Sequence, residues 1–397
     1  MDILPDIESL PEWEMRIETR RFGPFTFRLG VDGAALATLY QRVLDAHERF
    51  SRSPLSQVDR ELEREVVVSS IFGTNSIEGG TLTEEETQLA LDLDPAQVAD
   101  EERLRAVNLK AAYDLAQQAA TTSDWRLTVP FIQSVHAAIT RRLTHPYNQP
   151  GAFRDNPKGI KTYVGNQDHG GQYQPPQHGH DIETLIQALV NWHTGLEERG
   201  VPALIRAPLV HYYYELIHPF WDGNGRVGRV LEATLLQAAG FHYAPFALAR
   251  YYLLHIDEYF TLFNQCRKAA KKKVAYPHTA FVKFHLEGMR VSINRLHDQV
   301  NHIVKRRLFE SQVRQLYDEK RVNARQYTII SQLLTTRPVS LIEMRRTPWY
   351  QSLYLKLNDK TRRRDLHQLR DLGLVIVDRQ DRIWPGCREI EPVPEDH

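Results

Sequence analysis

The 397-residue sequence contains few sulfur atoms, with two cysteines, Cys266 and Cys387, and four methionines. Two thiols cannot form a framework of disulfides, so the class of small disulfide-stabilised secreted domains is excluded. No stretch approaches the roughly 18 apolar residues of a membrane span. Residues 1–20 are rich in acids and do not follow a signal-peptide pattern. These absences predict a protein of the reducing cytoplasm with no membrane partner.

The chain also has no net charge, since 50 Lys and Arg balance 50 Asp and Glu. The balance is uneven, because residues 321–388 contain 14 Lys and Arg but only 6 Asp and Glu. We therefore expect a separate basic module near the C-terminal end. The hydrophobic content of 42% is ordinary for a globular protein, and the length predicts two or three domains.

The most informative segment is HPFWDGNGRVGR at residues 218–229. Apolar residues recur at spacings near 3.6 before His218 and again after Val230, which predicts a helix on each side. Between these helices Gly223 and Gly225 allow positive φ and close approach of the backbone to a ligand. Amides exposed at the start of the second helix form an anion-binding concavity.

The side chains of this segment suit a polyphosphate held beside a nucleophile. Arg226 and Arg229 are three positions apart, so they share a helical face and can bind separate phosphates. Asp222 is placed to hold Mg²⁺, which commonly binds through one or two carboxylates and phosphate oxygens. His218 can accept a proton from an incoming hydroxyl. Each residue alone has an ordinary alternative, a packed histidine or a surface ion pair, and the combination is what indicates a function.

Other nucleotide and metal motifs are excluded. Residues 223–228 satisfy G-x-G-x-x-G, but the dinucleotide fingerprint requires a preceding strand and an acid about 20 residues later. A helix is predicted before this motif, and the region around Leu248 contains no acid. No P-loop motif occurs. His218 and Asp222 lack a third transition-metal ligand in register, and H-E-x-x-H is absent.

Residues 218–229 resemble the signature of the Fic family, H-x-F-x-[DE]-G-N-G-R-x-x-R, at every fixed position. Enzymes of this family most often transfer AMP from ATP to a hydroxyl of a protein Ser, Thr or Tyr. The resemblance implies that His218 is the general base and Asp222 the Mg²⁺ ligand. It also implies that the outermost phosphate is held by Arg229 and the other phosphates by Gly223, Asn224, Gly225 and Arg226.

A second motif precedes this signature. Glu78 is followed by two glycines that end a helix, and a glutamate at such a point is ordinarily solvated. However, Thr74-x-x-x-Glu78-Gly79 resembles the inhibitory motif [ST]-x-x-x-E-[GN] of one class of Fic proteins. The resemblance implies that Glu78 pairs with Arg229, keeps that arginine from the γ-phosphate and displaces the α-phosphate. We therefore expect a protein that is autoinhibited at rest.

The loop-rich section 156–177 contains two short segments, 160–164 and 172–174, that can pair as a hairpin with a long turn. A plain surface loop is the alternative. The section resembles the Fic flap, whose open edge adds a strand of the target protein and directs its hydroxyl to the motif histidine. Such edge pairing demands no particular target sequence. The positions carried over are Lys161, Thr162, Tyr163, Val164 and Gly165.

Apolar periodicity predicts further helices at residues 33–50, 58–72, 87–93, 101–120, 129–143, 181–196, 251–270 and 279–305. Residues 1–27 are polar and irregular and predict a loose arm, with one strand at 25–29. The helix at 251–270 is rich in aromatic residues. Tyr251, Tyr252 and Tyr259 either face the adenine, as the resemblance suggests, or pack in the core.

Residues 323–385 predict a separate unit of three helices, at 327–334, 350–357 and 359–372, followed by a hairpin of 374–377 and 383–384. Helices followed by a two-stranded wing resemble a winged helix-turn-helix. Arg362, Arg363 and Arg364 would then lie on the recognition helix, where their charge permits contacts with phosphates. Winged helices also serve as protein docking modules, so DNA stays open as a partner.

Together these features predict a mainly α protein with a Fic-type helical core, a β-hairpin flap and a C-terminal winged helix-turn-helix. The expected regions are an N-terminal helical region with the inhibitory motif (1–110), a catalytic core (111–290), a helical linker (291–322) and the winged helix domain (323–390). The expected activity is that of a protein adenylyltransferase, autoinhibited by Glu78, that uses ATP and Mg²⁺. Its target is a Ser, Thr or Tyr hydroxyl of a protein, the protein itself included, and homodimer formation stays open.

Two kinds of alternative remain. Within the same enzyme class are transfer of UMP, phosphocholine or phosphate, and removal of AMP with Glu78 orienting a water molecule. A different class is a nucleotide-sensing, DNA-binding transcriptional regulator.

Overall fold

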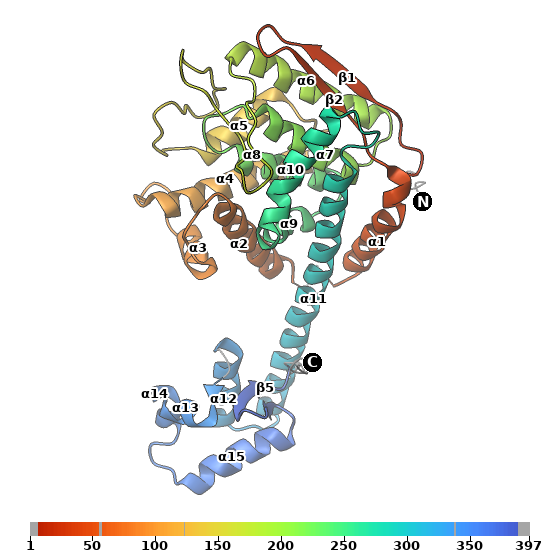
Figure 1. Ribbon diagram of the computed structural model, residues 1–397. Helices are drawn as coiled ribbons and strands as arrows, with labels where there is room; N and C mark the ends of the chain where they lie inside the picture. Colours follow the sequence, from red (N-terminus) through yellow and green to blue (C-terminus); the bar gives the residue numbers. More distant parts are fainter. Residues whose placement is uncertain (1–6, 55–57, 123, 337–338, 388–397) are drawn as a thin grey trace. The chain divides into compact units, whose positions relative to one another are not determined.

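The computed structural model describes residues 7–54, 58–122, 124–336 and 339–387, and these are mainly helical, as predicted (Figure 1). The chain divides into two compact units, Met1–Leu55 with Asp59–His297, and Ser56–Val58 with Asp298–His397. Apart from residues 56–58, the predicted regions 1–110 and 111–290 fall in the first unit, and the finer division stays a prediction. Within the described residues, no helix combines the length and the hydropathy that a transmembrane segment requires.

The helices of the first unit follow the expected periodicity closely. Several begin at a side-chain cap, for example Asp32, Thr83, Asp100 and Thr128, each of which accepts a hydrogen bond from a backbone N–H of the first turn. The described helices are α1 (Gly33–Ser51), α2 (Asp59–Ile77), α3 (Glu84–Leu91), α4 (Glu101–Thr121), α5 (Val129–Ile139), α6 (Gly179–Glu198), α7 (Ala203–Ile217), α8 (Asn224–Ala238), α9 (Ala244–Leu254), α10 (Ile256–Lys271) and the first part of α11 (Thr279–Asp318).

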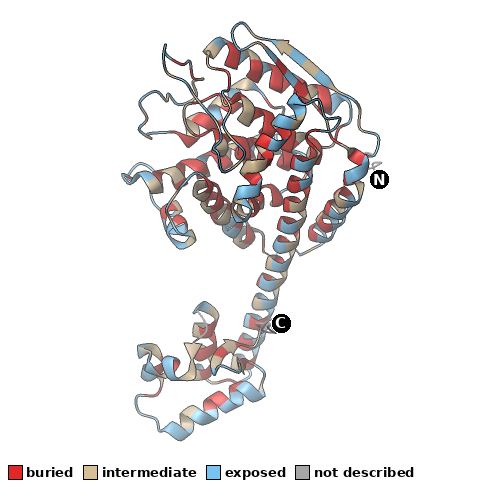
Figure 2. Ribbon diagram, in the orientation of Figure 1, coloured by how far each residue is buried: buried red, intermediate tan, exposed pale blue. Residues whose placement is uncertain are grey.

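Helix α8 is the centre of the first unit. It contacts α2, α4, α5, α7 and α9, and every residue from Arg226 to Gln237 is buried. Figure 2 shows the helices around it with their buried sides turned inward. A helix that is covered all round is held by packing on every side, so the segment at its N-terminus has a rigid base.

The N-terminal segment differs from the prediction of a loose arm. The expected strand is present as β2 (Pro24–Arg28), but it pairs antiparallel with a second strand, β1 (Glu14–Glu18). The turn between them is held by the carboxylate of Asp181 on α6, which accepts backbone N–H groups of residues 20, 21 and 22 at 2.9–3.1 Å. Because β1 is short and polar, and the carboxylate that holds its turn is remote in sequence, local pattern does not reveal it.

Four helix boundaries also differ. Helix α2 continues past the predicted end at Phe72 to Ile77, α5 ends at Ile139 and α11 extends to Asp318. The single helix predicted at 251–270 is wrong, because α9 and α10 are divided at His255, which has φ −121° and ψ 38°. No glycine or proline marks this break. The ring Nδ1 of His255 lies 3.0 Å from the carbonyl oxygen of Tyr251, a local contact that competes with continuation of the helix.

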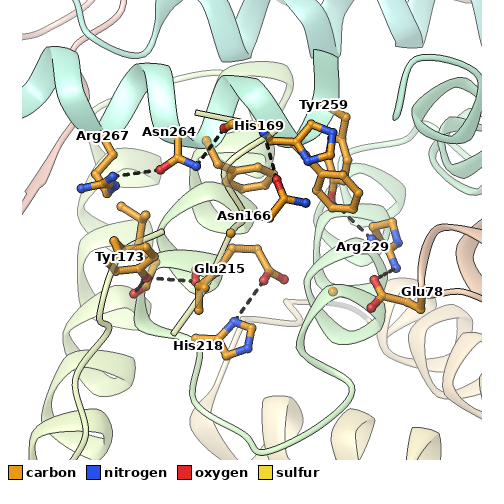
Figure 3. A pocket seen from close by; sticks show the side chains of 16 residues that line it. Glu78, Asn166, His169, Tyr173, Glu215, His218, Arg229, Tyr259, Asn264 and Arg267 are labelled. Carbon is orange, nitrogen blue, oxygen red and sulfur yellow. Dashed lines mark hydrogen bonds and ion pairs between the residues drawn. The ribbon is translucent and has the colours of Figure 1, made fainter. Parts of the chain in front are cut away.

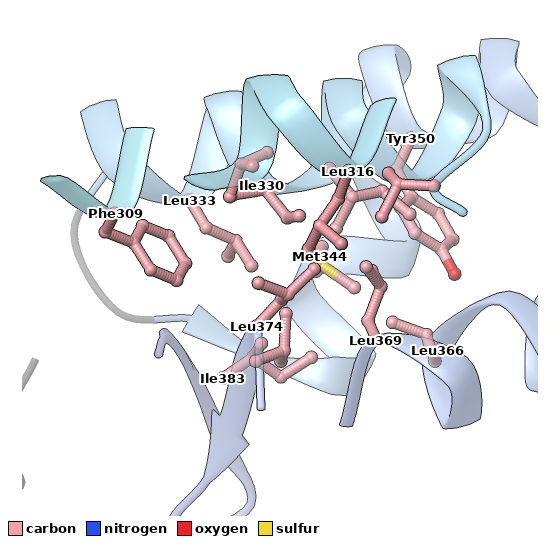
Figure 4. Packing of buried hydrophobic residues seen from close by; sticks show 14 of the residues in the cluster. Phe309, Leu316, Ile330, Leu333, Met344, Tyr350, Leu366, Leu369, Leu374 and Ile383 are labelled. Atoms are coloured by element: carbon pink, nitrogen blue, oxygen red, sulfur yellow. The ribbon is translucent and has the colours of Figure 1, made fainter. Parts of the chain in front are cut away.

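The second unit combines helices with a three-stranded antiparallel sheet of order β3-β5-β4. The predicted hairpin is present as β4 (Val375–Val377) and β5 (Arg382–Pro385), and α12 (Ala324–Thr335) and α15 (Asp359–Asp371) match predicted helices. The helix predicted at 350–357 is present only in part, as α14 (Pro348–Leu353), and neither α13 (Leu341–Arg346) nor β3 (Val339–Ser340) was predicted. Buried apolar residues from α11, α12, α13, α15 and the sheet form one cluster (Figure 4).

Two buried histidines make the first unit sensitive to acid. Burial, with the charge of Arg206, lowers the pKa of His193 to about 3, and burial lowers the pKa of His278 to about 4. Because an unfolded histidine has a pKa near 6.5, the unfolded chain binds more protons as the pH falls below that value. The free energy of unfolding should therefore decrease between pH 6.5 and about 4, by about 2 kcal/mol for each histidine at pH 5.

Hydrogen exchange of α6 and α7 amides at pH 7 and pH 5, corrected for the intrinsic rates, measures this loss. A His278→Gln variant should lose less stability on acidification than the parent protein. Equal protection of these amides at both pH values would contradict the prediction.

Candidate active site

The signature segment is a loop between α7 and α8. Helix α7 ends at Ile217, and His218 follows in the left-handed region at φ 50° and ψ 63°. Gly223 has φ 80° and caps α8 without a side-chain hydrogen bond. The side chain of Asn224 fixes the loop, since its Oδ1 accepts the Phe220 N–H at 2.9 Å and its Nδ2 donates to the Phe220 carbonyl at 2.8 Å. The residues of the signature therefore lie on one short loop, 218–223, and on the first turns of α8.

Arg226 lies buried beside Asp222. One of its terminal nitrogens donates to both carboxylate oxygens of Asp222 at 2.9–3.0 Å. Burial is the largest single influence on Asp222 and opposes its ionisation, but the charge and hydrogen bonds of Arg226, the Gly223 N–H and the charge of Arg105 together lower the pKa of the carboxyl group. The Nε and Nη1 atoms of Arg226 are buried and have no hydrogen-bond partner. Buried cationic donors without a partner are costly, and an anionic ligand would satisfy them.

The pairing predicted between Glu78 and Arg229 is present. An oxygen of Glu78 lies 2.6 Å from Nη2 of Arg229, whose guanidinium also donates to the Thr74 carbonyl at 3.3 Å and the Tyr259 hydroxyl at 3.4 Å. Burial opposes the charge of Arg229, yet Glu78 and Tyr259 more than compensate and raise its pKa. A Cβ atom at position 225 would lie 2.1 Å from Glu78 Oε1, so this close approach requires Gly225.

A cavity of about 230 Å³ lies beside His218 and the Glu78–Arg229 pair (Figure 3). It is lined by the end of α7 and the start of α8, by the loop 164–173 and by α10. The lining residues are Glu78, Val164, Gly165, Asn166, His169, Tyr173, Glu215, Leu216, His218, Gly225, Arg229, Tyr259, Phe260, Phe263, Asn264 and Arg267. Of the predicted phosphate-binding positions, Gly225 and Arg229 line this cavity, whereas Gly223, Asn224 and Arg226 do not, and neither does the predicted metal ligand Asp222.

The flap segment is a loop with a single antiparallel bridge. Val164 and Tyr173 exchange two backbone hydrogen bonds of 2.9 Å each, so the predicted pairing is present at one residue pair. Asn264 of α10 donates its amide to the carbonyls of His169 and Gly171 at 3.0 and 2.7 Å, and the Tyr173 hydroxyl donates to the Leu216 carbonyl. Lys161 and Tyr163 are exposed. The loop is thus anchored at its tip and base. The side chain of Gln177 also accepts the Thr162 N–H at 2.8 Å and donates to the Thr162 carbonyl at 3.2 Å, so within 161–163 the exposed positions are Lys161 and Tyr163.

Tyr251, Tyr252 and Tyr259, which were predicted either to face the adenine or to pack in the core, lie in different environments. Tyr251 and Tyr252 are buried in the core. Tyr252 donates its hydroxyl to Glu232 at 3.0 Å. Only Tyr259 of the three lines the cavity, and its hydroxyl lies 3.0 Å from His211 Nε2.

Several residues behind the site were not predicted. Glu232 is buried between His211 and His285, 3.0 and 2.9 Å from their Nδ1 atoms. Burial raises the pKa of Glu232, but the two histidines outweigh that effect and lower it. Arg154 is buried and donates its Nε to the His218 carbonyl at 2.7 Å. No sequence motif surrounds Glu232 or Arg154, and only the fold brings each of them to its partners.

Asp222 could hold Mg²⁺ only together with ligands that the protein itself does not supply. Within the described parts of the chain, no group of three or more His, Cys, Asp or Glu side chains is arranged to hold a metal ion. Asp222 is a single ionised carboxylate beside buried arginine donors without partners. Such a site suits a cation that shares its coordination with phosphate oxygens and water, and does not suit an ion that needs only protein ligands.

Residues 126–236 match the model of the Fic/DOC family. The protein adenylyltransferase Fic of Drosophila ananassae is 30% identical over 185 residues, which cover 46% of this chain and 34% of that protein. A probable protein adenylyltransferase of Aquifex aeolicus is 27% identical over 190 residues, covering 45% of this chain and 55% of the relative. The matched part therefore spans between about a third and about half of the length of these relatives.

Solved structures show the same fold. A Fic domain containing signaling protein from Bacteroides thetaiotaomicron has a TM-score of 0.54 at 18% identity, covering 66% of this chain and 97% of the other. A Fic family protein from Desulfovibrio desulfuricans G20 has a TM-score of 0.52 at 18% identity and covers 88% of this chain and 95% of the other. The signature loop, the family match and the shared fold together show that this chain contains a domain of the Fic/DOC family.

Proposed function

We propose that this protein is an adenylyltransferase that transfers AMP from ATP to a hydroxyl group of a protein. The observation that carries the proposal is the position of His218, which lines a cavity with Arg229, while the first turn of α8 holds the unpartnered donors of Arg226. A base and an arginine that line one cavity, with a second arginine on the same helix, suit attack on a polyphosphate. The names of the relatives described above support the same chemistry.

The reaction follows from this geometry. The target hydroxyl attacks the α-phosphorus and gives its proton to Nε2 of His218. An oxygen–phosphorus bond forms to the target, the bond between the α-phosphorus and the bridging oxygen breaks, and pyrophosphate leaves. Arg226 and Arg229 neutralise charge on the phosphates, so most of the catalysis comes from positioning and electrostatic stabilisation. Asp222 would hold Mg²⁺, which supplies further charge neutralisation when it is bound.

The contact of Glu78 with Arg229 supports an autoinhibited resting state. The carboxylate occupies the guanidinium that the outermost phosphate would use, and it lies against Gly225 at the wall of the cavity. A triphosphate placed on Arg229 would meet the negative charge of Glu78 at close range, which is unfavourable in a partly buried site. Release of Glu78 would open this position.

The exposed edge of the flap supports a protein as the second substrate. Lys161 and Tyr163 are exposed and directly precede Val164 and Gly165, which line the cavity. A strand of a target protein that pairs with this edge would hold its side chain over the cavity, whatever the target sequence.

The proposal predicts that protein-bound label comes from the α-phosphate alone. The purified protein is incubated with Mg²⁺ and ATP that is labelled at either the α- or the γ-phosphate, alone and with host lysate. Label from α-labelled ATP should remain on protein, and label from γ-labelled ATP should appear only in pyrophosphate. Mass spectrometry then locates the added AMP.

Other outcomes identify the alternatives. Protein-bound γ-label would indicate phosphate transfer, and stronger labelling by UTP than by ATP would indicate UMP transfer. ATP binding with no label from any nucleotide would contradict the proposal and favour the regulator. Two of the three arginines expected on its DNA-binding helix are engaged within the second unit, since Arg362 lies over the ring of Tyr354 and Arg363 pairs with Asp359 at 3.0 Å.

A further inference from the structure

The main chain of His218 is fixed on both sides, but its ring is not. The N–H of His218 donates to the Tyr214 carbonyl at 2.9 Å, and its carbonyl accepts from Arg154 at 2.7 Å. Neither contact involves the imidazole. The ring Nδ1 is buried and has no hydrogen-bond partner. A general base needs Nδ1 protonated, so that Nε2 presents its lone pair to the substrate. A hydrogen-bond acceptor close to Nδ1 is needed to favour the Nδ1-protonated tautomer.

Glu215 is the acidic group beside this nitrogen. It lies one turn before His218 on α7, and its Oε2 is 3.6 Å from His218 Nδ1 (Figure 3). Both side chains are largely covered, with 12% of Glu215 and 22% of His218 exposed. The other oxygen of Glu215, Oε1, is buried and has no hydrogen-bond partner. The carboxylate and the ring nitrogen are therefore each other's nearest available partner.

A carboxylate kept in this place without structural partners is unusual. Glu232, the other buried glutamate near the site, binds two histidines and a tyrosine. Glu215 makes no comparable contact, although burial of an unsatisfied carboxylate is costly. Gly228 provides its space, because a Cβ at that position would lie 2.7 Å from Glu215 Oε1. The fold thus accommodates a carboxylate whose evident use is at His218.

We propose that Glu215 is a positioning residue for His218. It accepts the Nδ1–H of the imidazole, orients the ring with Nε2 toward the cavity and stabilises the imidazolium that forms when the hydroxyl proton is taken up. The distance of 3.6 Å closes to hydrogen-bond length in the substrate complex, as catalytic hydrogen bonds commonly tighten on binding. This inference rests on the proposed role of His218 as the base.

The first test measures the tautomer of His218 and does not depend on turnover. Nitrogen-15 labelled histidine is introduced, and the ring signals are assigned by their loss in a His218→Asn variant. In the parent protein the neutral ring should carry its proton on Nδ1. In Glu215→Ala it should shift toward the Nε2–H form, whereas Glu215→Gln should keep the Nδ1–H form, because its amide oxygen still accepts. An unchanged tautomer in Glu215→Ala would overturn the proposal.

The second test separates binding from chemistry. Glu215→Ala should lower kcat for AMP transfer by roughly 10- to 100-fold, the usual effect of removing a residue that orients a histidine, with little change in KM for ATP. Glu215→Gln should fall between this variant and the parent protein, and Glu198→Ala, exposed at the end of α6, is the matched control. A loss confined to KM would contradict the positioning role. A tautomer shift without AMP transfer by any variant would instead contradict the proposed function.

Discussion

Replacement of His218 should lower AMP transfer by roughly 10²- to 10⁴-fold, the contribution that a general base commonly makes. The hydroxyl of Ser, Thr or Tyr is a weak nucleophile until its proton is removed. In this cavity the imidazole of His218 lies at the end of α7 with no other histidine of the signature loop to replace it. Binding of ATP should persist, because the arginines and the glycine backbone that are proposed to bind phosphate are unchanged.

The choice of variant matters because of the backbone. His218 has φ 50° and ψ 63°, a left-handed conformation that alanine adopts only with strain but asparagine tolerates. We therefore expect His218→Ala and His218→Asn to lose transfer equally, with Asn keeping the parent stability. His180→Ala, at an exposed position of α6, is the control. Labelling with α-labelled ATP measures transfer, and calorimetry measures ATP binding. Sustained labelling of both His218 variants would exclude this histidine as the base.

Replacement of Glu78 by Gly should raise AMP transfer by roughly 10- to 100-fold. A hydrogen bond between two charged groups is worth about 1.5–3 kcal/mol, and each 1.4 kcal/mol corresponds to about tenfold in rate or equilibrium. In the parent protein the 2.6 Å contact holds Arg229 on the carboxylate, so under the proposed inhibition ATP would have to displace Glu78 before its outer phosphate is bound. The glycine variant removes that competition.

Two further variants separate charge from chain flexibility. Glu78→Ala should be activated like Glu78→Gly, and Glu78→Gln should be activated less, since the amide still occupies the space beside Gly225. A Glu78→Gly, His218→Asn double variant should be inactive. Initial rates with α-labelled ATP are compared at equal protein concentration. If the Gly and Ala variants are no faster than the parent although they bind ATP, Glu78 has no inhibitory role.

The signature loop can be predicted from sequence because the features that define it belong to residues close together in the chain. Two apolar helices, a glycine interruption and arginines three positions apart are properties of neighbouring residues, and α7, α8 and the loop between them follow the expected pattern. The contact between Glu78 and Arg229 joins distant segments, yet it was expected because both ends carry family motifs. Where a motif is present, long-range contacts become predictable.

The features that were missed depend on tertiary contacts. Strand β1 is stabilised by β2 and by the clasp of Asp181 on the turn, neither of which local hydrophobicity reports. The break at His255 has no glycine or proline. Glu215 resembles any other helical glutamate until the fold buries it beside His218. Some of their partners are close in the chain, as Tyr251 is to His255 and His218 is to Glu215, but these contacts depend on tertiary packing and side-chain orientation, so periodicity alone cannot identify them.

The burial of α8 on every side separates two parts of substrate recognition, the binding of phosphates and the docking of the acceptor protein. A helix enclosed by five others cannot tilt or unwind to suit different targets, so the geometry around the phosphates stays constant from one acceptor protein to the next. In the proposed mechanism, adaptation comes from the exposed edge at Lys161 and Tyr163. Because such an edge pairs through its main chain, acceptors of different sequence would meet the same phosphate geometry, and the rate of the chemical step would not depend on the acceptor sequence.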